Sequence, residues 1–188
     1  MKILVLSGSN MGRKTRIATQ AVYQLLSELA PEHELNYINL QDKTLEMSDG
    51  RHFLDYKGDT LELTQAIMAS DVIVIGSPIF QASIPGNLKN VFDLLPQDAF
   101  LGKTVSLVMT AGSWKHFLVG EQHLKPILSY MKANLLPNYV FLIDTDFGAE
   151  GIENDEIQLR LKKLVEDTLL LAETYQKMQS LQEEDYGF

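Results

Sequence analysis

Short runs of aliphatic and β-branched residues alternate along the chain with longer stretches in which apolar residues recur at a helical period. Uninterrupted apolar runs of this length are typical of strands that are buried on both faces of a parallel sheet. The pattern therefore predicts five strands, at residues 2–6, 34–40, 72–75, 104–109 and 139–143.

Five further segments carry apolar residues at the spacing of an amphipathic helix. They cover residues 18–29, 60–70, 88–95, 117–134 and 157–172. Pro126 would bend the fourth of these helices or split it in two, because proline lacks the N–H that a helix interior needs. Residues 41–58 show no period and read as a long loop, a feature that is often functional in compact domains.

Strands that alternate with helices predict an α/β fold, a doubly wound three-layer sandwich with right-handed crossovers and helices on both faces of the sheet. The loops richest in polar residues follow the first, third and fourth strands, which favours the flavodoxin-like strand order 2-1-3-4-5 for the five-stranded parallel sheet. We expect one domain over residues 1–180 and a polar, frayed tail over 181–188.

The composition argues against several classes of function. The formal net charge of −9 over 188 residues argues against binding to nucleic acid, which needs clustered Lys and Arg. Cys is absent, so disulfides, thiolate catalysis and cysteine-ligated metals are excluded. His33 and His52 are too scattered for a metal site, and we expect no metal. No segment resembles a signal peptide or a membrane span, so the expected compartment is the cytoplasm by default.

The turn after the first strand has the composition of a phosphate site. A Ser- and Gly-rich turn that runs into a helix offers unpaired N–H groups and the positive end of the helix dipole to an anion. The alternative is a capped helix with solvated basic residues. Hydroxyl donors and cations both lie here: Ser7, Ser9, Thr15, Arg13, Lys14 and Arg16.

The identity of the phosphate ligand is open at this point. The dinucleotide fingerprint G-x-G-x-x-G is absent, and the Walker A pattern is missed by one residue because Arg13 replaces the second glycine. The best Asp for a Mg²⁺ ion would be Asp144, whose strand is not adjacent to the first in the expected order. A P-loop-like phosphotransferase is therefore a weak alternative.

The central stretch carries a specific family resemblance. Gly76-Ser77-Pro78 is expected to break the third strand, and Pro85-Gly86 to begin the next helix. The motifs Ser-Pro-Ile-Phe at 77–80 and Ser-Ile-Pro-Gly-Asn-Leu-Lys-Asn at 83–90 resemble the flavin loop of NAD(P)H-dependent FMN reductases. Phe80 replaces the usual Tyr and so lacks its hydroxyl. The resemblance implies FMN contacts from Pro78, Ile79, Phe80, Gln81 and Ser83.

The same family resemblance extends to the phosphate turn. Members of the family frequently carry the pattern Gly-Ser-x-Arg-x-x-Ser at this turn. In this chain the Arg comes four residues after Ser9, instead of two. The run Gly-Arg-Lys-Thr-Arg-Ile-Ala at 12–18 is similar to azoreductase-type members. On these grounds we favour Arg13 and Thr15, with Ser9, as phosphate ligands.

The turn after the fourth strand would form a second wall of the ligand crevice. Gly112 permits close approach of backbone to a flat ligand, and successive N–H groups can face the negative charge of a reduced flavin. Ala111, Gly112 and Ser113 are therefore candidate cofactor-binding residues. Runs between residues 94 and 128 resemble two-component flavin reductases, which supply reduced FMN to a partner monooxygenase; Gln122 stands where some carry Tyr.

These observations predict an NAD(P)H-dependent FMN oxidoreductase that passes hydride from NADPH or NADH to flavin N5, and then to free flavin, quinone, azo compound or oxygen. No catalytic side chain is expected, because hydride transfer to N5 needs no protein nucleophile. A flavodoxin-like electron carrier without NAD(P)H turnover is the alternative. His116, His123 and Trp114 could serve the second substrate or be structural. The resemblance implies a homodimer or homotetramer.

Overall fold

The protein is described here by a computed structural model that places residues 1–186, with side chains up to residue 181. Within this range all strand pairs of the sheet are parallel. The strands follow the order β2-β1-β3-β4-β5, and β6 also pairs with β4, so the expected order is confirmed with two short strands sharing the fifth position. The strands are β1 (Lys2–Ser7), β2 (Glu34–Asn39), β3 (Val72–Pro78), β4 (Thr104–Ala111), β5 (Asn134–Leu135) and β6 (Val140–Ile143).

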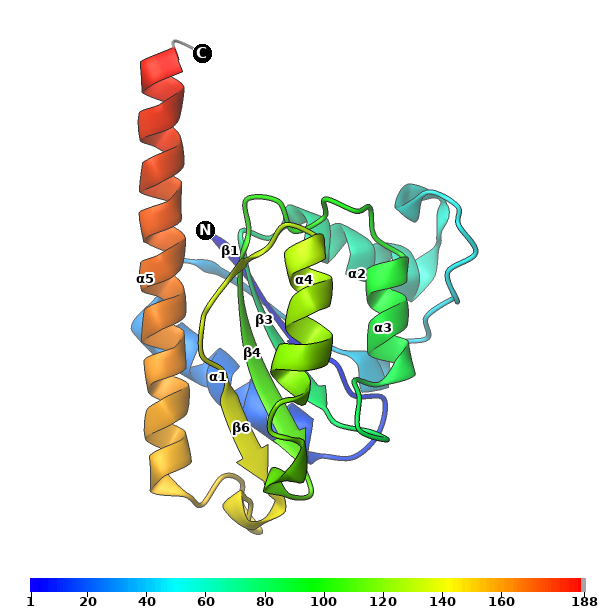
Figure 1. Cartoon of the computed structure of the whole chain (residues 1–188), viewed down its shortest axis with the longest axis vertical. Helices are drawn as coiled ribbons and strands as arrows, with labels where there is room; N and C mark the ends of the chain where they lie inside the picture. Colours follow the sequence, from blue (N-terminus) through cyan, green and yellow to red (C-terminus); the bar gives the residue numbers. More distant parts are fainter. Residues whose placement is uncertain (187–188) are drawn as a thin grey trace.

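The helices form two layers, one on each face of this sheet (Figure 1). Helices α1 (Lys14–Leu29) and α5 (Asp155–Tyr186) cover one face, and α2 (Gly58–Ala69), α3 (Gly86–Asp93) and α4 (Lys125–Tyr130) cover the other. Side chains of successive strand residues point to opposite faces. Leu4 and Leu6 of β1 accordingly join the cluster under α2, α3 and α4, while Ile3 and Val5 join the cluster under α1 and α5.

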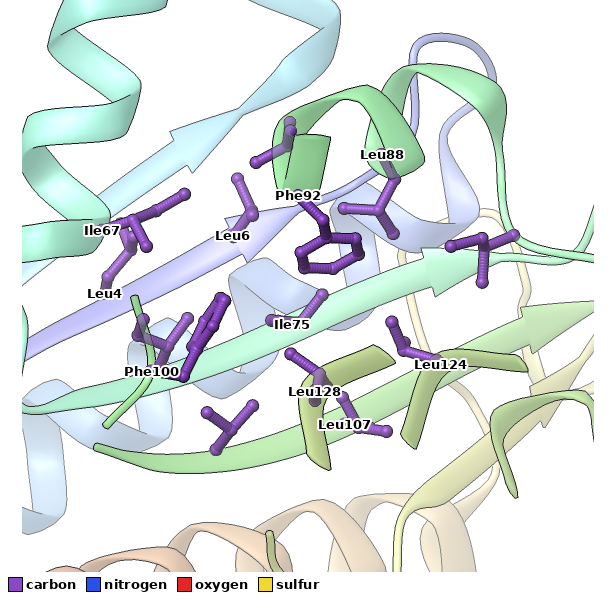
Figure 2. Close-up of a cluster of buried hydrophobic side chains, with 14 of the residues drawn as sticks. Leu4, Leu6, Ile67, Ile75, Leu88, Phe92, Phe100, Leu107, Leu124 and Leu128 are labelled. Atoms are coloured by element: carbon purple, nitrogen blue, oxygen red, sulfur yellow. The ribbon is translucent and has the colours of Figure 1, made fainter. Parts of the chain in front are cut away.

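Figure 2 shows the first of these clusters. Phe92 of α3 and the buried Phe100 lie with their rings 6.1 Å apart, and Figure 2 shows both beside Ile75 of β3. Each side chain in the cluster contributes apolar area removed from water, at about 25 cal/mol per Å². Burial of apolar side chains on both faces therefore stabilises the sheet between the two helix layers.

Two strand ends differ from the prediction. We expected Gly76-Ser77-Pro78 to break the third strand, but β3 continues to Pro78, which lies opposite Thr110 in the parallel register. Proline is tolerated because it lies beyond the pairing of β3 with β1, which ends at Gly76, so the strand is locally an edge there. The next residue, Ile79, donates its N–H to the Thr110 carbonyl at 2.9 Å. Likewise β4 continues two residues beyond the expected end, to Ala111.

The predicted helix over 117–134 is wrong in its extent. A 3₁₀ turn at Trp114–His116 and a π-helical turn at Gly120–Leu124 precede a short α4 that ends at Tyr130. The π-helical turn runs directly into α4, and Pro126 is the second residue of α4, so the helical segment divides in two beside the proline, as expected. Gly120 packs against Tyr139, and a Cβ there would lie 2.9 Å from the tyrosine ring.

Helix α5 is longer than predicted. It runs to Tyr186, through most of the segment expected to be a frayed tail, and projects past the edge of the sheet (Figure 1). Residues 187 and 188 of that predicted tail lie outside the described residues. None of the helices in the described part of the chain combines the length and the apolar character that a membrane crossing needs.

The long loop over 41–58 is ordered by polar contacts with α2 and α3. The buried side chain of Asn90 donates to the Glu46 carbonyl at 2.9 Å and accepts from the Ser48 N–H at 2.8 Å. At the tip, the Tyr56 hydroxyl donates to Asp49 at 3.0 Å. The Arg51 guanidinium lies 4.4 Å from the Tyr56 ring centroid. Asn90, part of the flavin-loop resemblance, therefore anchors this loop.

The loop tip should respond to acid. Hydrogen bonds from Arg51 hold the pKa of Asp49 well below its usual 3.8. A lowered folded-state pKa means that the pair stabilises the fold above pH 3.8 and loses this effect as the pH falls through the folded value. The unfolding free energy of the wild type should exceed that of Asp49→Asn near neutral pH, and the difference should shrink in acid. Urea denaturation across pH checks this; a difference independent of pH would contradict it.

The close approach of β3 to α1 makes Gly76 sensitive to substitution. A Cβ at Gly76 would lie 2.2 Å from Cγ2 of Thr19, which is buried and whose hydroxyl donates to the Thr15 carbonyl. Gly76→Ala should therefore lower the unfolding free energy by about 1–3 kcal/mol. Gly86→Ala is the matched control, since no atom lies within 4 Å of its added Cβ. Urea denaturation should show little loss for the control; equal losses would contradict this view of the packing.

Candidate active site

The three polar turns predicted from the sequence converge at the carboxyl edge of the sheet. The register aligns Ser7 of β1 with Gly76 of β3, and Pro78 of β3 with Thr110 of β4. The turns that follow these strands border one cavity of about 370 Å³. It is lined by Met11, Gly12, Arg13, Lys14, Thr15, Pro78, Ile79, Phe80, Thr110, Ala111, Gly112 and Asp144.

The amino end of α1 opens into this cavity without a cap. Arg13 is the N-cap residue, and its side chain makes no capping hydrogen bond. The first turn of the helix holds no acidic residue. The first N–H groups of the 16-residue helix therefore lack internal partners, and its positive dipole end faces the cavity. This arrangement suits a phosphate.

The serines of the first turn shape it rather than line the cavity. Ser7 is fully buried at the end of β1. Gly8 donates its N–H to the Gly76 carbonyl at 2.7 Å, and a Cβ at Gly8 would meet the same oxygen, so only glycine fits. The Ser9 hydroxyl donates to the Met11 carbonyl at 2.5 Å and so closes the turn on itself. Of the three predicted hydroxyl ligands, only Thr15 lies on the lining.

Both predicted cations lie at the cavity rim, each bound to the loop after β6. The Arg13 guanidinium donates to the Gly148 and Ala149 carbonyls at 3.4 and 3.2 Å. Lys14 Nζ lies 2.6 Å from Asp144 Oδ1. Asp144, considered above as a magnesium ligand, is thus the counter-ion of Lys14. An anion in the cavity would compete with Asp144 for this ammonium group.

A buried hydrogen bond joins the first and third turns. The hydroxyls of Thr15 on α1 and Thr110 on β4 lie 2.7 Å apart, and both residues are buried. Thr110 is one of the cavity residues that sequence reasoning did not select as a ligand, although it directly precedes the selected Ala111. This bond fixes the distance between the cationic and the main-chain-lined ends of the cavity.

The middle turn has an uncommon backbone. Phe80 and Ser83 exchange two backbone hydrogen bonds of 2.9 and 3.0 Å, while Gln81 and Ala82 have φ of +47° and +60°. Positive φ at both central residues is the type I′ geometry, in which Asn and Gly are favoured. Phe80 faces the cavity, whereas Gln81 and Ser83 do not line it. The Ser83 hydroxyl lies 3.0 Å from His123 Nδ1.

The structure therefore brings together eight of the thirteen residues proposed from the sequence. Ser7, Ser9, Gln81, Ser83 and Ser113 stand outside the lining. Met11, Gly12, Thr110 and Asp144 line the cavity but were not selected. The composition of the turns could have indicated Gly12 and Thr110, whereas the position of Asp144 depends on how β6 pairs with β4.

The cavity has two chemically different ends. One end offers helix N–H groups and two cations, and the other offers the apolar Pro78, Ile79 and Phe80 opposite the open backbone of Gly112. A phosphate joined to a flat ring matches both ends. Fold and cavity together define a flavodoxin-like α/β protein with a polar and apolar cavity at the point where the strand order reverses.

Comparison with known proteins identifies the family. The profile of the NADPH-dependent FMN reductase family matches residues 1–148. An NAD(P)H-dependent FAD/FMN reductase of Geobacillus thermodenitrificans is 35% identical over 165 residues, which cover 87% of this chain and 89% of the relative. The chain thus belongs to the NADPH-dependent FMN reductase family, whose members are oxidoreductases that use FMN and a reduced nicotinamide nucleotide.

Solved structures agree with the fold. An oxidoreductase from Corynebacterium diphtheriae superposes with a TM-score of 0.70 at 29% identity, covering 91% of this chain and 96% of the other. Flavodoxin 1 from Bacillus cereus superposes with a TM-score of 0.63 at 14% identity, covering 90% and 97%, which shows the shared fold.

The Thr15–Thr110 bond gives a test of the site's geometry. Thr15→Val and Thr110→Val should each lower the unfolding free energy by about 1–3 kcal/mol, because each leaves a buried hydroxyl unpaired. The double variant should lose less than the sum of the two, since no unpaired hydroxyl remains. Urea denaturation of all four proteins measures the coupling energy. Strictly additive losses would mean that the two hydroxyls do not interact.

Proposed function

We propose that this cavity holds FMN, with its phosphate at the amino end of α1 and its ring between the two other turns. The single observation that carries the proposal is the convergence of the three turns on one cavity. The donor set fits: uncapped helix N–H groups, Arg13 and Lys14 suit a phosphate dianion, and Thr15 adds a hydroxyl.

The other residues would bind and orient the ring. Pro78, Ile79 and Phe80 offer an apolar wall that excludes water from one side of a planar ligand. Phe80 acts through packing alone, because it lacks a hydroxyl. Ala111 and Gly112 present main-chain groups without a bulky side chain, so a ring edge can approach closely. Bound FMN would itself supply the hydride chemistry, accepting hydride from NADPH or NADH.

We propose a small molecule as the final electron acceptor, namely free flavin, a quinone, an azo compound or oxygen. Alternatively, reduced FMN is passed to a partner monooxygenase. We further propose a cytoplasmic homodimer or homotetramer. A groove between α3 and α4, with Phe92, Leu95, Ile127 and a largely exposed Tyr130, offers apolar area for contact between copies. Area of this kind on a surface is typical of an interface.

Two measurements test the flavin assignment. FMN titrated into the purified protein should bind, and the loaded protein should oxidise NADPH or NADH in steady state. No FMN binding would reject the proposal. FMN binding without nicotinamide turnover would instead indicate an electron carrier.

Arg13 provides a test of the orientation of FMN. Arg13→Ala should weaken FMN roughly ten- to hundredfold, the range of a charged hydrogen bond, and should change riboflavin affinity little because riboflavin lacks the phosphate. Arg16→Ala is the matched control, an exposed arginine three residues away that does not line the cavity. Fluorescence titration with both flavins measures the affinities. Equal losses for FMN and riboflavin would contradict the phosphate assignment.

A further inference from the structure

A second cavity, of about 510 Å³, adjoins the first. The middle turn separates them, with Phe80 on the first cavity and Ala82 on the second. The segment after β4 runs along both, with Gly112 on the first and Trp114 on the second. The lining of the second cavity consists of Ala82, Trp114, Lys115, His116, Phe117, Leu118, Val119, Gln122 and His123.

Trp114 forms a fixed aromatic platform in this cavity. Its ring stacks on that of Phe141, with centroids 5.3 Å apart and an angle of 29° between the planes. Phe141 is buried in the core, and Phe117 packs beside both rings. Trp114 nevertheless remains 50% exposed. An aromatic ring that packs against the core and remains half exposed to solvent is suited to stacking with a nucleobase.

The charge of the cavity opposes that of the chain. The protein carries a formal charge of −9, yet the lining contains Lys115, His116 and His123 and no Asp or Glu. The contact of His123 Nδ1 with Ser83 Oγ at 3.0 Å orients its ring and links this cavity to the middle turn. A cationic group beside an aromatic platform favours a ligand that combines an aromatic base with an anion.

We propose that the second cavity binds the adenosine 2′-phosphate end of NADPH, while the nicotinamide end reaches the first cavity. Trp114 would stack on the adenine, and Lys115, with His116, would pair with the 2′-phosphate. The inference rests on the proposed flavin site, because the nicotinamide must lie against bound FMN. It assigns to Lys115 the discrimination between NADPH and NADH, which differ only in that phosphate.

A second copy of this chain is the competing occupant, since Phe117 and Leu118 are also exposed. A two-fold contact would place the same patch on both copies face to face. Lys115 of one copy would then approach the lysine of the other, and the lining offers no Asp or Glu as a counter-charge, which is unfavourable. Charge complementarity therefore favours an anionic ligand over self-association here.

Binding of a fragment tests the pocket directly. The FMN-loaded protein is titrated by calorimetry with adenosine 2′,5′-bisphosphate and with adenosine 5′-monophosphate. The bisphosphate should bind at least tenfold more tightly, and Lys115→Ala should remove most of this difference. Lys177→Ala, an exposed lysine on α5 far from the cavity in sequence, is the matched control and should keep it. Equal affinity of the two fragments for the wild type would overturn the proposal.

The chain's single tryptophan gives a second readout. Trp114 is the only Trp, so stacking of adenine should change the intrinsic fluorescence of flavin-free protein in the same titration. This measurement needs neither FMN nor turnover. A protein that fails to bind FMN would refute the flavin site, whereas unchanged fluorescence at saturating bisphosphate would refute the adenosine pocket, so the two failures are distinguishable.

Kinetics complete the test. In Lys115→Ala the ratio of kcat/KM for NADPH to that for NADH should fall roughly ten- to hundredfold relative to the wild type. An unchanged ratio would overturn the assignment of Lys115. Sedimentation velocity on the same proteins addresses the competing occupant. Dissociation of a wild-type oligomer by Lys115→Ala would identify this face as a contact between copies and would likewise overturn the proposal.

Discussion

The parallel register of β1, β3 and β4 is the constraint on which the rest of the structure depends. Backbone hydrogen bonds set Ser7 beside Gly76 and Pro78 beside Thr110, so the three strands end at one edge of the sheet. The turns that follow these three strands therefore lie together at that edge of the sheet. Apolar packing on both faces holds the register, because a slip by one residue would exchange the inward and outward side chains.

Within that frame, the two ends of the cavity are stabilised by different interactions. The uncapped start of α1 supplies partial positive charge that no side chain of the helix's first turn neutralises. Lys14 is balanced by Asp144, an exposed ion pair of the kind worth at most about 1 kcal/mol, so an arriving phosphate can replace the carboxylate at little loss. The Thr15–Thr110 bond keeps the remaining geometry fixed.

Much of this arrangement could be predicted from the sequence. The long buried strands were located because uninterrupted apolar runs are a local signal, and their order followed from which loops are polar. The extent of the helix in segment 117–134 was misjudged, because apolar periodicity does not reveal a π-helical turn such as Gly120–Leu124, nor the packing of Gly120 against Tyr139. Asp144 reaches the cavity through the pairing of β6 with β4, another non-local event. Serines such as Ser9 look like ligands in sequence yet close their own turn.

The type I′ turn at Gln81 and Ala82 has a consequence for the speed and thermodynamics of association. Left-handed backbone at a residue other than glycine costs roughly 1–2 kcal/mol, and here two neighbouring residues adopt it. The two backbone hydrogen bonds between Phe80 and Ser83 hold the turn in this conformation. A planar molecule arriving at Phe80 would thus meet a surface that is already shaped, with little entropy left to lose in ordering it.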